Sequence, residues 1–297
     1  MLRATLLFLS RRPALRRWME TSQFAQPLTR RFVAGETLTD AVAACARVNQ
    51  ERFLVSLDHL GENVSTREEA AASTTQILAA LEQIRVRNLQ ATVSIKLTQF
   101  GLDLDPELTY SNVAPLAERA REIGSRVEID MESSEYVDRT LDIVTRLHAE
   151  FGCVRAVIQA YLHRSEADIR RLNELRIPIR LCKGAYQEPP TVALQGKAAV
   201  DANYLKLAAL LLADGTDPAF ATHDDRMIAP ARPHPKDRFE YQMLYGVRRD
   251  LQKRLVAEGY RLRLYVPYGD AWYPYFMRRL AERPANLWFV IRSTLSN

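Results

Sequence analysis

The sequence predicts an α/β fold, an irregular (βα)8 barrel of the TIM type. Eight short apolar runs alternate with stretches of helical periodicity, the pattern of consecutive βαβ units and a parallel sheet. The chain has 297 residues, close to the size of a closed (βα)8 barrel. No Gly-x-Gly-x-x-Gly motif follows any of the runs, so nothing indicates the phosphate loop of an open Rossmann sheet.

The eight apolar runs are the predicted strands. They are Phe53–Leu57, Thr92–Leu97, Arg126–Met131, Arg155–Tyr161, Pro178–Cys182, Ala219–Thr222, Phe239–Leu244 and Arg261–Val266. Short runs of this kind are typical of strands in a parallel sheet that is covered by helices.

Helical stretches fill most of the gaps between the strands. The clearest is Thr66–Leu89, whose first four residues form a capping box. Pro106–Ile123 contains Pro115, which predicts a helix start or a kink. The segment 224–238 holds three prolines and is barely long enough for a crossover helix, so we expect a shortened connection there. The other predicted helices are Ser134–Ala149, Ser165–Leu175 and Val200–Ala213.

Composition narrows the function classes. Apolar residues make up 47% and charged residues 26% of the chain, as in a folded globular protein. The net charge is +5, but no basic run with interleaved aromatic residues indicates nucleic-acid binding. The cysteines Cys45, Cys153 and Cys182 are odd in number and widely spaced. They therefore predict no metal site and a reducing compartment, the cytoplasm.

The N-terminal segment is basic. Its first nineteen residues carry five arginines and no acid around the apolar run 6–9. Three interpretations are open: a cleaved targeting peptide, an amphipathic helix at a membrane surface, or a helix packed against the body. We favour the packed helix, with peripheral contact at the inner face of the cell membrane as an alternative. We expect a single domain over 1–297, with N-terminal helices in 1–50 and the barrel in 51–297.

Polar residues gather where the predicted strands end, which is where a (βα)8 barrel holds its active site. They include several cations, Lys96, Arg180 and Lys183, so we expect an anionic group such as a substrate carboxylate or a cofactor pyrophosphate. Gly184, after the fifth strand, would let backbone approach a phosphate closely. The strand-end residues are Asp58, Glu62, Lys96, Asp130, Gln159, Tyr161, Arg180, Lys183, Tyr186, Thr222, His223, Asp224 and Tyr265.

Several of these strand-end segments together resemble the proline dehydrogenase family. Each segment alone is unremarkable, but their combination and order, from about Arg31 to the C-terminus, are specific. The Gln187 that follows Tyr186 favours the monofunctional group of the family. The matching segments are 93–97, 180–186, 220–223, 239–242 and 265–269, followed by Tyr275, Arg278, Arg279 and Glu282.

The resemblance implies an activity. A member of this family oxidises L-proline to Δ1-pyrroline-5-carboxylate, the first step of proline catabolism to glutamate. Hydride passes from proline C5 to N5 of a non-covalently bound FAD, and the electrons then pass to a membrane quinone. The resemblance also implies that the last helix lies over the barrel mouth. It leaves the oligomeric state open.

The resemblance also assigns roles to residues of this chain. Asp130 and Arg180 are the catalytic pair: Arg180 contacts the flavin, and Asp130 orients Lys96 or Arg278. Glu62 is a gate residue that pairs with the first arginine of Arg278-Arg279. The substrate-binding residues are Lys96, Tyr186, Leu244, Tyr265, Arg278 and Arg279. The cofactor-binding residues are Met131, Gln159, Arg180, Lys183, Gly184, Ala185, Thr222 and His223.

Other interpretations compete with these roles. The aromatic residues and Leu244 could be ordinary core, and Arg278-Arg279 could be a solvated helix face. A rival enzyme would be a lyase or aldolase that uses Lys96 or Lys183 as a Schiff-base nucleophile. A non-enzymatic alternative is a membrane-surface binding protein that uses the arginine-rich N-terminus. A flavoprotein would be yellow, whereas a Schiff-base aldolase would be colourless.

Overall fold

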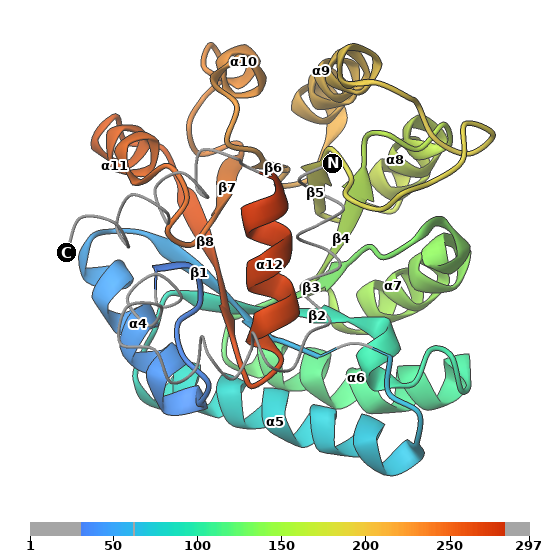
Figure 1. Ribbon diagram of the computed structural model, residues 1–297, viewed down its shortest axis with the longest axis vertical. Helices are drawn as coiled ribbons and strands as arrows, with labels where there is room; N and C mark the ends of the chain where they lie inside the picture. The colour runs from blue at the N-terminus through green and yellow to red at the C-terminus, as the bar shows by residue number, and fades with distance from the viewer. Residues whose placement is uncertain (1–30, 62, 283–297) are drawn as a thin grey trace.

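The computed structural model describes residues 31–61 and 63–282, with side chains as far as Met277. Eight parallel strands pair in sequence order, and β1 also pairs with β8, so the sheet closes into a barrel (Figure 1). The predicted fold class is therefore confirmed. The strands are β1 (Leu54–His59), β2 (Ala91–Lys96), β3 (Val127–Asp130), β4 (Val154–Gln159), β5 (Ile179–Cys182), β6 (Ala219–Ala221), β7 (Glu240–Leu244) and β8 (Leu262–Tyr268).

Helices connect the strands around the outside of the barrel (Figure 1). The predicted capping box is present at Thr66, where α5 begins. Asp105 caps α6 and Pro106 is its first residue, so the alternative that this helix starts at Pro115 is wrong. The helices are α5 (Arg67–Val86), α6 (Pro106–Glu122), α7 (Val137–Phe151), α8 (Ser165–Glu174), α9 (Lys197–Asp214) and α11 (Arg249–Ala257).

The connection between β6 and β7 is short, as the three prolines of 224–238 predicted. It holds only α10 (Asp225–Ile228) and the 3-10 turn η3 (Ala229–Ala231). Two further 3-10 turns, η1 (Leu97–Phe100) and η2 (Ser134–Tyr136), follow β2 and β3. The expected α-helical start at Ser134 is thus a 3-10 turn, and α7 proper begins at Val137.

Two helices stand outside the regular alternation. Helix α4 (Leu38–Gln50) contacts β1 and β8, so it covers the seam where the barrel closes. Helix α12 (Trp272–Glu282) follows β8 and crosses the centre of the barrel in Figure 1. Its aromatic side chains pack on Leu60 and Val247, which follow the C-terminal ends of β1 and β7. The last helix therefore lies over the mouth, as expected. The helices expected within residues 1–30 lie outside the described part.

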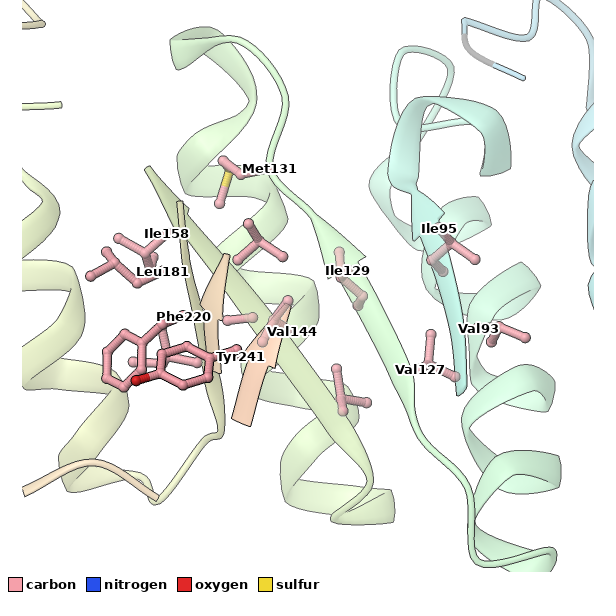
Figure 2. Packing of buried hydrophobic residues seen from close by; sticks show 14 of the residues in the cluster. Val93, Ile95, Val127, Ile129, Met131, Val144, Ile158, Leu181, Phe220 and Tyr241 are labelled. Carbon is pink, nitrogen blue, oxygen red and sulfur yellow. The ribbon is translucent and has the colours of Figure 1, made fainter. Parts of the chain in front are cut away.

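The main hydrophobic core lies between the strands and the surrounding helices. Figure 2 shows apolar side chains of this layer, among them Ile129 of β3, Leu181 of β5 and Val144 of α7. Alternate residues of the same strands point to the other side, into the barrel. In the segments 31–61 and 63–282, no helix combines the length and the apolar character that a membrane span requires.

The barrel interior is polar, whereas branched apolar residues usually fill it. Glu128 of β3 bonds to Arg180 of β5, and Arg155 of β4 bonds to Glu240 of β7. These strands are not neighbours in the sheet, so the contacts must cross the inside of the barrel. Sequence patterns did not indicate this network, because a charged residue inside a strand is more often expected at an exposed edge.

Candidate active site

A cavity of about 500 Å³ opens at the C-terminal ends of the strands. This volume lies within the usual range for small-molecule sites. Asp58 and Tyr161, which also stand at strand ends, do not line it. Every described residue that was assigned a catalytic, substrate or cofactor role does: Lys96, Asp130, Met131, Gln159, Arg180, Lys183, Gly184, Ala185, Tyr186, Thr222, His223, Leu244 and Tyr265.

Three predicted residues cannot be placed in this cavity. Glu62, the expected gate, lies outside the described residues. Arg278 and Arg279 belong to α12, but their side chains lie beyond the described ones. Their roles stay predictions. The helix to which both belong, α12, crosses the barrel (Figure 1).

Arg180, Asp130 and Tyr265 form a hydrogen-bonded group at the cavity floor. Arg180 Nη1 donates to Asp130 Oδ1 at 2.7 Å, and the Tyr265 hydroxyl donates to Asp130 Oδ2 at 2.7 Å. The guanidinium also lies 5.5 Å from the centre of the Tyr265 ring, within cation–π range. Three residues from three strands thereby fix one another's orientation.

These contacts bear on the expected role of Asp130, which was to orient Lys96 or Arg278; a contact with Arg278 stays a prediction, because that side chain lies beyond the described ones. The described partners of Asp130 are Arg180 and Tyr265 rather than Lys96. Lys96 Nζ lies 3.6 Å from Oδ1 of Asp58, a buried carboxylate on β1. Lys96 and Asp130 are register partners on adjacent strands, but the Lys96 ammonium lies beside Asp58 instead.

The protonation states of this group are held by its surroundings. Burial would lower the pKa of Arg180, but the carboxylates of Glu128 and Asp130 outweigh burial and raise it. Burial and the neighbouring Asp130 charge raise the pKa of Tyr265 well above its ordinary value. Burial raises the pKa of Cys182, which also lines the cavity, to about 11. A cationic arginine, a neutral phenol and a neutral thiol therefore face the ligand space at neutral pH.

Gln159 lines the cavity and carries a buried acceptor. Its Nε2 donates to the carbonyl of Glu132 at 2.7 Å, which fixes the amide. Its Oε1 is buried and has no hydrogen-bond partner among the described residues. A buried polar atom without a partner is costly, so a ligand N–H is its natural complement. An isoalloxazine ring carries an N–H beside carbonyl and ring-nitrogen acceptors, so this floor fits a flavin.

His223 is held in one tautomer. The backbone N–H of Leu244 donates to His223 Nε2 at 2.9 Å, so this nitrogen carries no proton. Nε2 is therefore already engaged and is not available to a metal ion. In addition, the part of the chain with described side chains contains no group of three or more residues suited to holding a metal.

The structure gives Gly184 a reason to be glycine besides the expected approach of a phosphate, which stays a prediction. Its φ of +106° lies in the left-handed region, and a Cβ there would collide with the ring of Tyr161. The space is thus filled by a side chain of this protein. The neighbouring Lys183 contacts Asp201 and lies 3.4 Å from Asp224.

Sequence reasoning missed several cavity residues. Met243 and Ala221 line the wall, and Gln242 lines the floor. Glu128 lies beneath the floor, where it bonds Arg180. Strand alternation would have found Glu128, because it stands two residues before Asp130 and so points to the same side of the sheet.

Comparisons with known proteins agree with this geometry. Residues 41–292 match a family model described as proline dehydrogenase. Proline dehydrogenase 1 of Bacillus subtilis (strain 168) is 40% identical over 302 residues, which covers 99% of both chains. The proline dehydrogenase of Deinococcus radiodurans is 41% identical over 279 residues, 90% of each chain.

A solved structure is also similar. It is proline utilization A from Bdellovibrio bacteriovorus, inactivated by N-propargylglycine. The TM-score is 0.80 at 27% sequence identity, over 87% of this chain and 33% of that one. The barrel therefore corresponds to one part of a longer protein in that case, and to nearly the whole length of the Bacillus protein.

Proposed function

Because the chain belongs to the proline dehydrogenase family, we propose that it oxidises L-proline to Δ1-pyrroline-5-carboxylate with non-covalently bound FAD and passes the electrons to a quinone. The observation that carries the proposal is the convergence of the predicted residues on one cavity of about 500 Å³. We take 1–297 as one domain with this activity.

The cavity offers complementary groups for both molecules. Lys96 and Arg180 supply positive charge, and Gln159 Oε1 supplies a buried acceptor. Met131, Lys183, Gly184, Ala185, Thr222 and His223 complete the wall proposed for the cofactor. FAD bound here would supply the redox chemistry, accepting a hydride at N5 from proline C5.

The residues of the chain act by orientation and charge. Arg180 is fixed by carboxylates and presents a permanent cation to the cavity, which would favour the negative charge of a reduced flavin. Tyr265 is fixed by Asp130, so its ring can line the proline site as a rigid wall with Leu244 and Tyr186. Lys96 would attract the substrate carboxylate, together with Arg278 and Arg279 of α12. Glu62 would gate this site by pairing with Arg278.

Hydride transfer from proline requires a neutral amine, so the proline ammonium must first lose its proton. The raised pKa values of Arg180, Tyr265 and Cys182 keep these groups protonated through pH 7–9. They therefore offer no base for the proline ammonium. The pH of the solution therefore sets the fraction of proline that carries a neutral amine. Activity should rise with pH as the amine deprotonates. A flat profile would contradict this account.

The decisive experiment is a visible spectrum before and after anaerobic addition of L-proline. A flavin band that bleaches with L-proline and not with D-proline is the expected result. A flavin band that L-proline leaves untouched would overturn the substrate. A colourless protein that takes up no FAD would overturn the cofactor and favour the Schiff-base lyase.

We further propose a cytoplasmic location with peripheral contact to the membrane that holds the quinone. The arginine-rich first nineteen residues motivate this proposal. Deleting residues 1–30 should leave activity with a soluble acceptor intact and weaken activity with quinone in anionic vesicles. Equal activity of both forms with the vesicles would count against it.

A further inference from the structure

Arg180 is clamped from inside the barrel as well as from the cavity side. Its Nε and Nη2 both donate to Oε2 of Glu128, and Nη2 also donates to Ser94 Oγ at 2.8 Å. Asp130 receives Nη1 at the mouth end. The guanidinium is thus held along one whole edge by Glu128, a carboxylate that does not line the cavity.

The donors of the guanidinium can be counted. An arginine side chain has five N–H groups in a rigid plane. Glu128 takes two, Ser94 takes one and Asp130 takes one. One N–H of Nη1 is left, and Arg180 lines the cavity. The plane cannot turn without breaking the paired contact to Glu128, so the direction of this last N–H is fixed.

Glu128 itself is fixed by the barrel. It is fully buried and accepts from Thr92 Oγ1 at 3.0 Å and from Gln242 Nε2 at 3.1 Å. Burial alone would raise its pKa, but the guanidiniums of Arg180, Arg155 and Arg263 outweigh burial and lower the pKa. Glu128 is therefore a permanent anion whose own position does not depend on a ligand.

We propose that Glu128 is a positioning residue for the reaction, which acts only through Arg180 by aiming its remaining N–H into the cavity. The effect on catalysis rests on the proposed function, since it assumes that Arg180 acts on a bound flavin. The effect on the geometry of Arg180 does not.

The barrel contains a matched control. Glu240 of β7 is 1% exposed and, like Glu128, is an inward carboxylate that accepts from arginines and from Gln242. Its arginine partners are Arg155 and Arg263, which lie deeper than Arg180 and do not line the cavity. Glu128→Gln and Glu240→Gln remove the same buried charge, and only the first removes it from Arg180.

The experiment compares the two variants in the wild-type and Arg180→Met backgrounds. Flavin reduction by L-proline is followed, with kcat and KM measured using a soluble acceptor. We expect Glu128→Gln to lower kcat about tenfold and to change KM less than about twofold. Glu240→Gln should lower kcat by less than about threefold. In the Arg180→Met background, Glu128→Gln should have almost no further effect, because coupled residues are not additive.

Either of two results would overturn the proposal. One is equal loss from Glu128→Gln and Glu240→Gln, which would indicate a general effect of buried charge. The other is the same fold-loss from Glu128→Gln with and without Arg180. If Glu128→Gln does not fold, Glu128→Asp and Ser94→Ala keep the charges and should each lower kcat about threefold through the loosened clamp.

A crystal structure of each variant separates this proposal from the proposed function. The contact between Arg180 Nη1 and Asp130 Oδ1 should be lost in the Glu128 variant and kept in the Glu240 variant. An unmoved guanidinium in Glu128→Gln refutes the positioning role, whatever the kinetics are. A moved guanidinium in a protein that L-proline does not reduce would uphold the positioning and refute the proposed substrate.

Discussion

The two ends of the barrel interior use the same chemistry for different purposes. At the N-terminal end, Asp217 accepts from Arg126, Arg155 and Arg261 at 2.7–2.8 Å. At the C-terminal end, Arg180 is shared by Glu128 and Asp130, but Gln159 keeps a buried acceptor without a described partner. At the N-terminal end the carboxylates and arginines pair with each other, whereas at the C-terminal end some polar groups are left to bind a ligand.

This difference indicates where stability and function separate. Buried ion pairs contribute little net stability compared with apolar packing, but removing one partner is costly because a charge is left buried. The inner pairs therefore make the polar barrel intolerant of change. The mouth can hold an incompletely paired group because the pairs beneath it fix the orientation of that group.

The largest expected effect comes from breaking the inner end. Arg155→Met leaves Glu240, Glu128 and Asp217 without their shared cation. We expect the free energy of unfolding to fall by about 3–5 kcal/mol. Urea denaturation of the purified protein measures this, with Arg126→Met, a partly exposed partner of Asp217, as the milder control. An unchanged unfolding midpoint would mean that the inner pairs do not hold the barrel.

Breaking the mouth end should affect catalysis more than stability. Arg180→Met removes the cavity cation, and we expect flavin reduction by L-proline to slow about 100-fold, as for the loss of one preorganised donor in other enzymes. Stopped-flow absorbance measures the rate. Arg261→Met, at the opposite end, should leave the rate within about twofold. A similar loss of rate in both variants would show that the two ends of the barrel do not differ in function.

Acid should weaken the inner pairs together. Burial raises the pKa of Glu240, but Arg263 and Arg155 outweigh it, so the pKa lies well below its ordinary value; the pKa of Glu128 is lowered likewise. A lowered folded-state pKa stabilises the protein above the unfolded value of 4.5 and loses that contribution as the pH falls below it.

The melting temperature should therefore decline steeply below about pH 4.5. Each such carboxylate contributes up to about 1.4 kcal/mol per pH unit to the slope of stability. Glu240→Gln should give a shallower decline than the wild-type protein. Parallel curves would show that Glu240 does not titrate on unfolding in this range.

A smaller effect is expected from the unpaired acceptor at the mouth. Gln159→Leu removes one hydrogen bond to a bound flavin and should weaken FAD binding about fivefold, or about 1 kcal/mol. Titration of the apoprotein followed by flavin fluorescence measures the dissociation constant. Gln252 is the control, since its buried Oε1 also lacks a described partner but does not line the cavity. Equal weakening by Gln252→Leu would remove the special role of Gln159.

The smallest effect should come from an ion pair outside the barrel. Arg146 donates twice to Glu107 on the surface, where both side chains are substantially exposed. Glu107→Gln should leave the urea unfolding midpoint close to that of the wild-type protein and leave activity unchanged, because solvent screens an exposed pair. A loss of stability comparable to that of Arg155→Met would mean that burial does not determine how costly it is to remove one partner of an ion pair.

The sequence by itself determined the strands and the end of the barrel that carries the chemistry. The apolar runs alternate with helices, and parallel strands expose their C-terminal ends on one side, so Lys96, Asp130, Arg180 and Tyr265 had to meet. The short proline-rich link after β6 was also predictable, because prolines limit helix length within a segment of known size.

Only the tertiary structure decided which groups pair. Lys96 turns to Asp58, Asp130 to Arg180 and Tyr265, and the space beside Gly184 is filled by the ring of Tyr161. Each of these contacts joins residues of different strands or loops, and its partner depends on barrel curvature and side-chain reach. Sequence spacing gives the order of the strands and the side to which Glu128 points, but not these distances, so the pairing of Glu128 with Arg180 became visible only in the folded barrel.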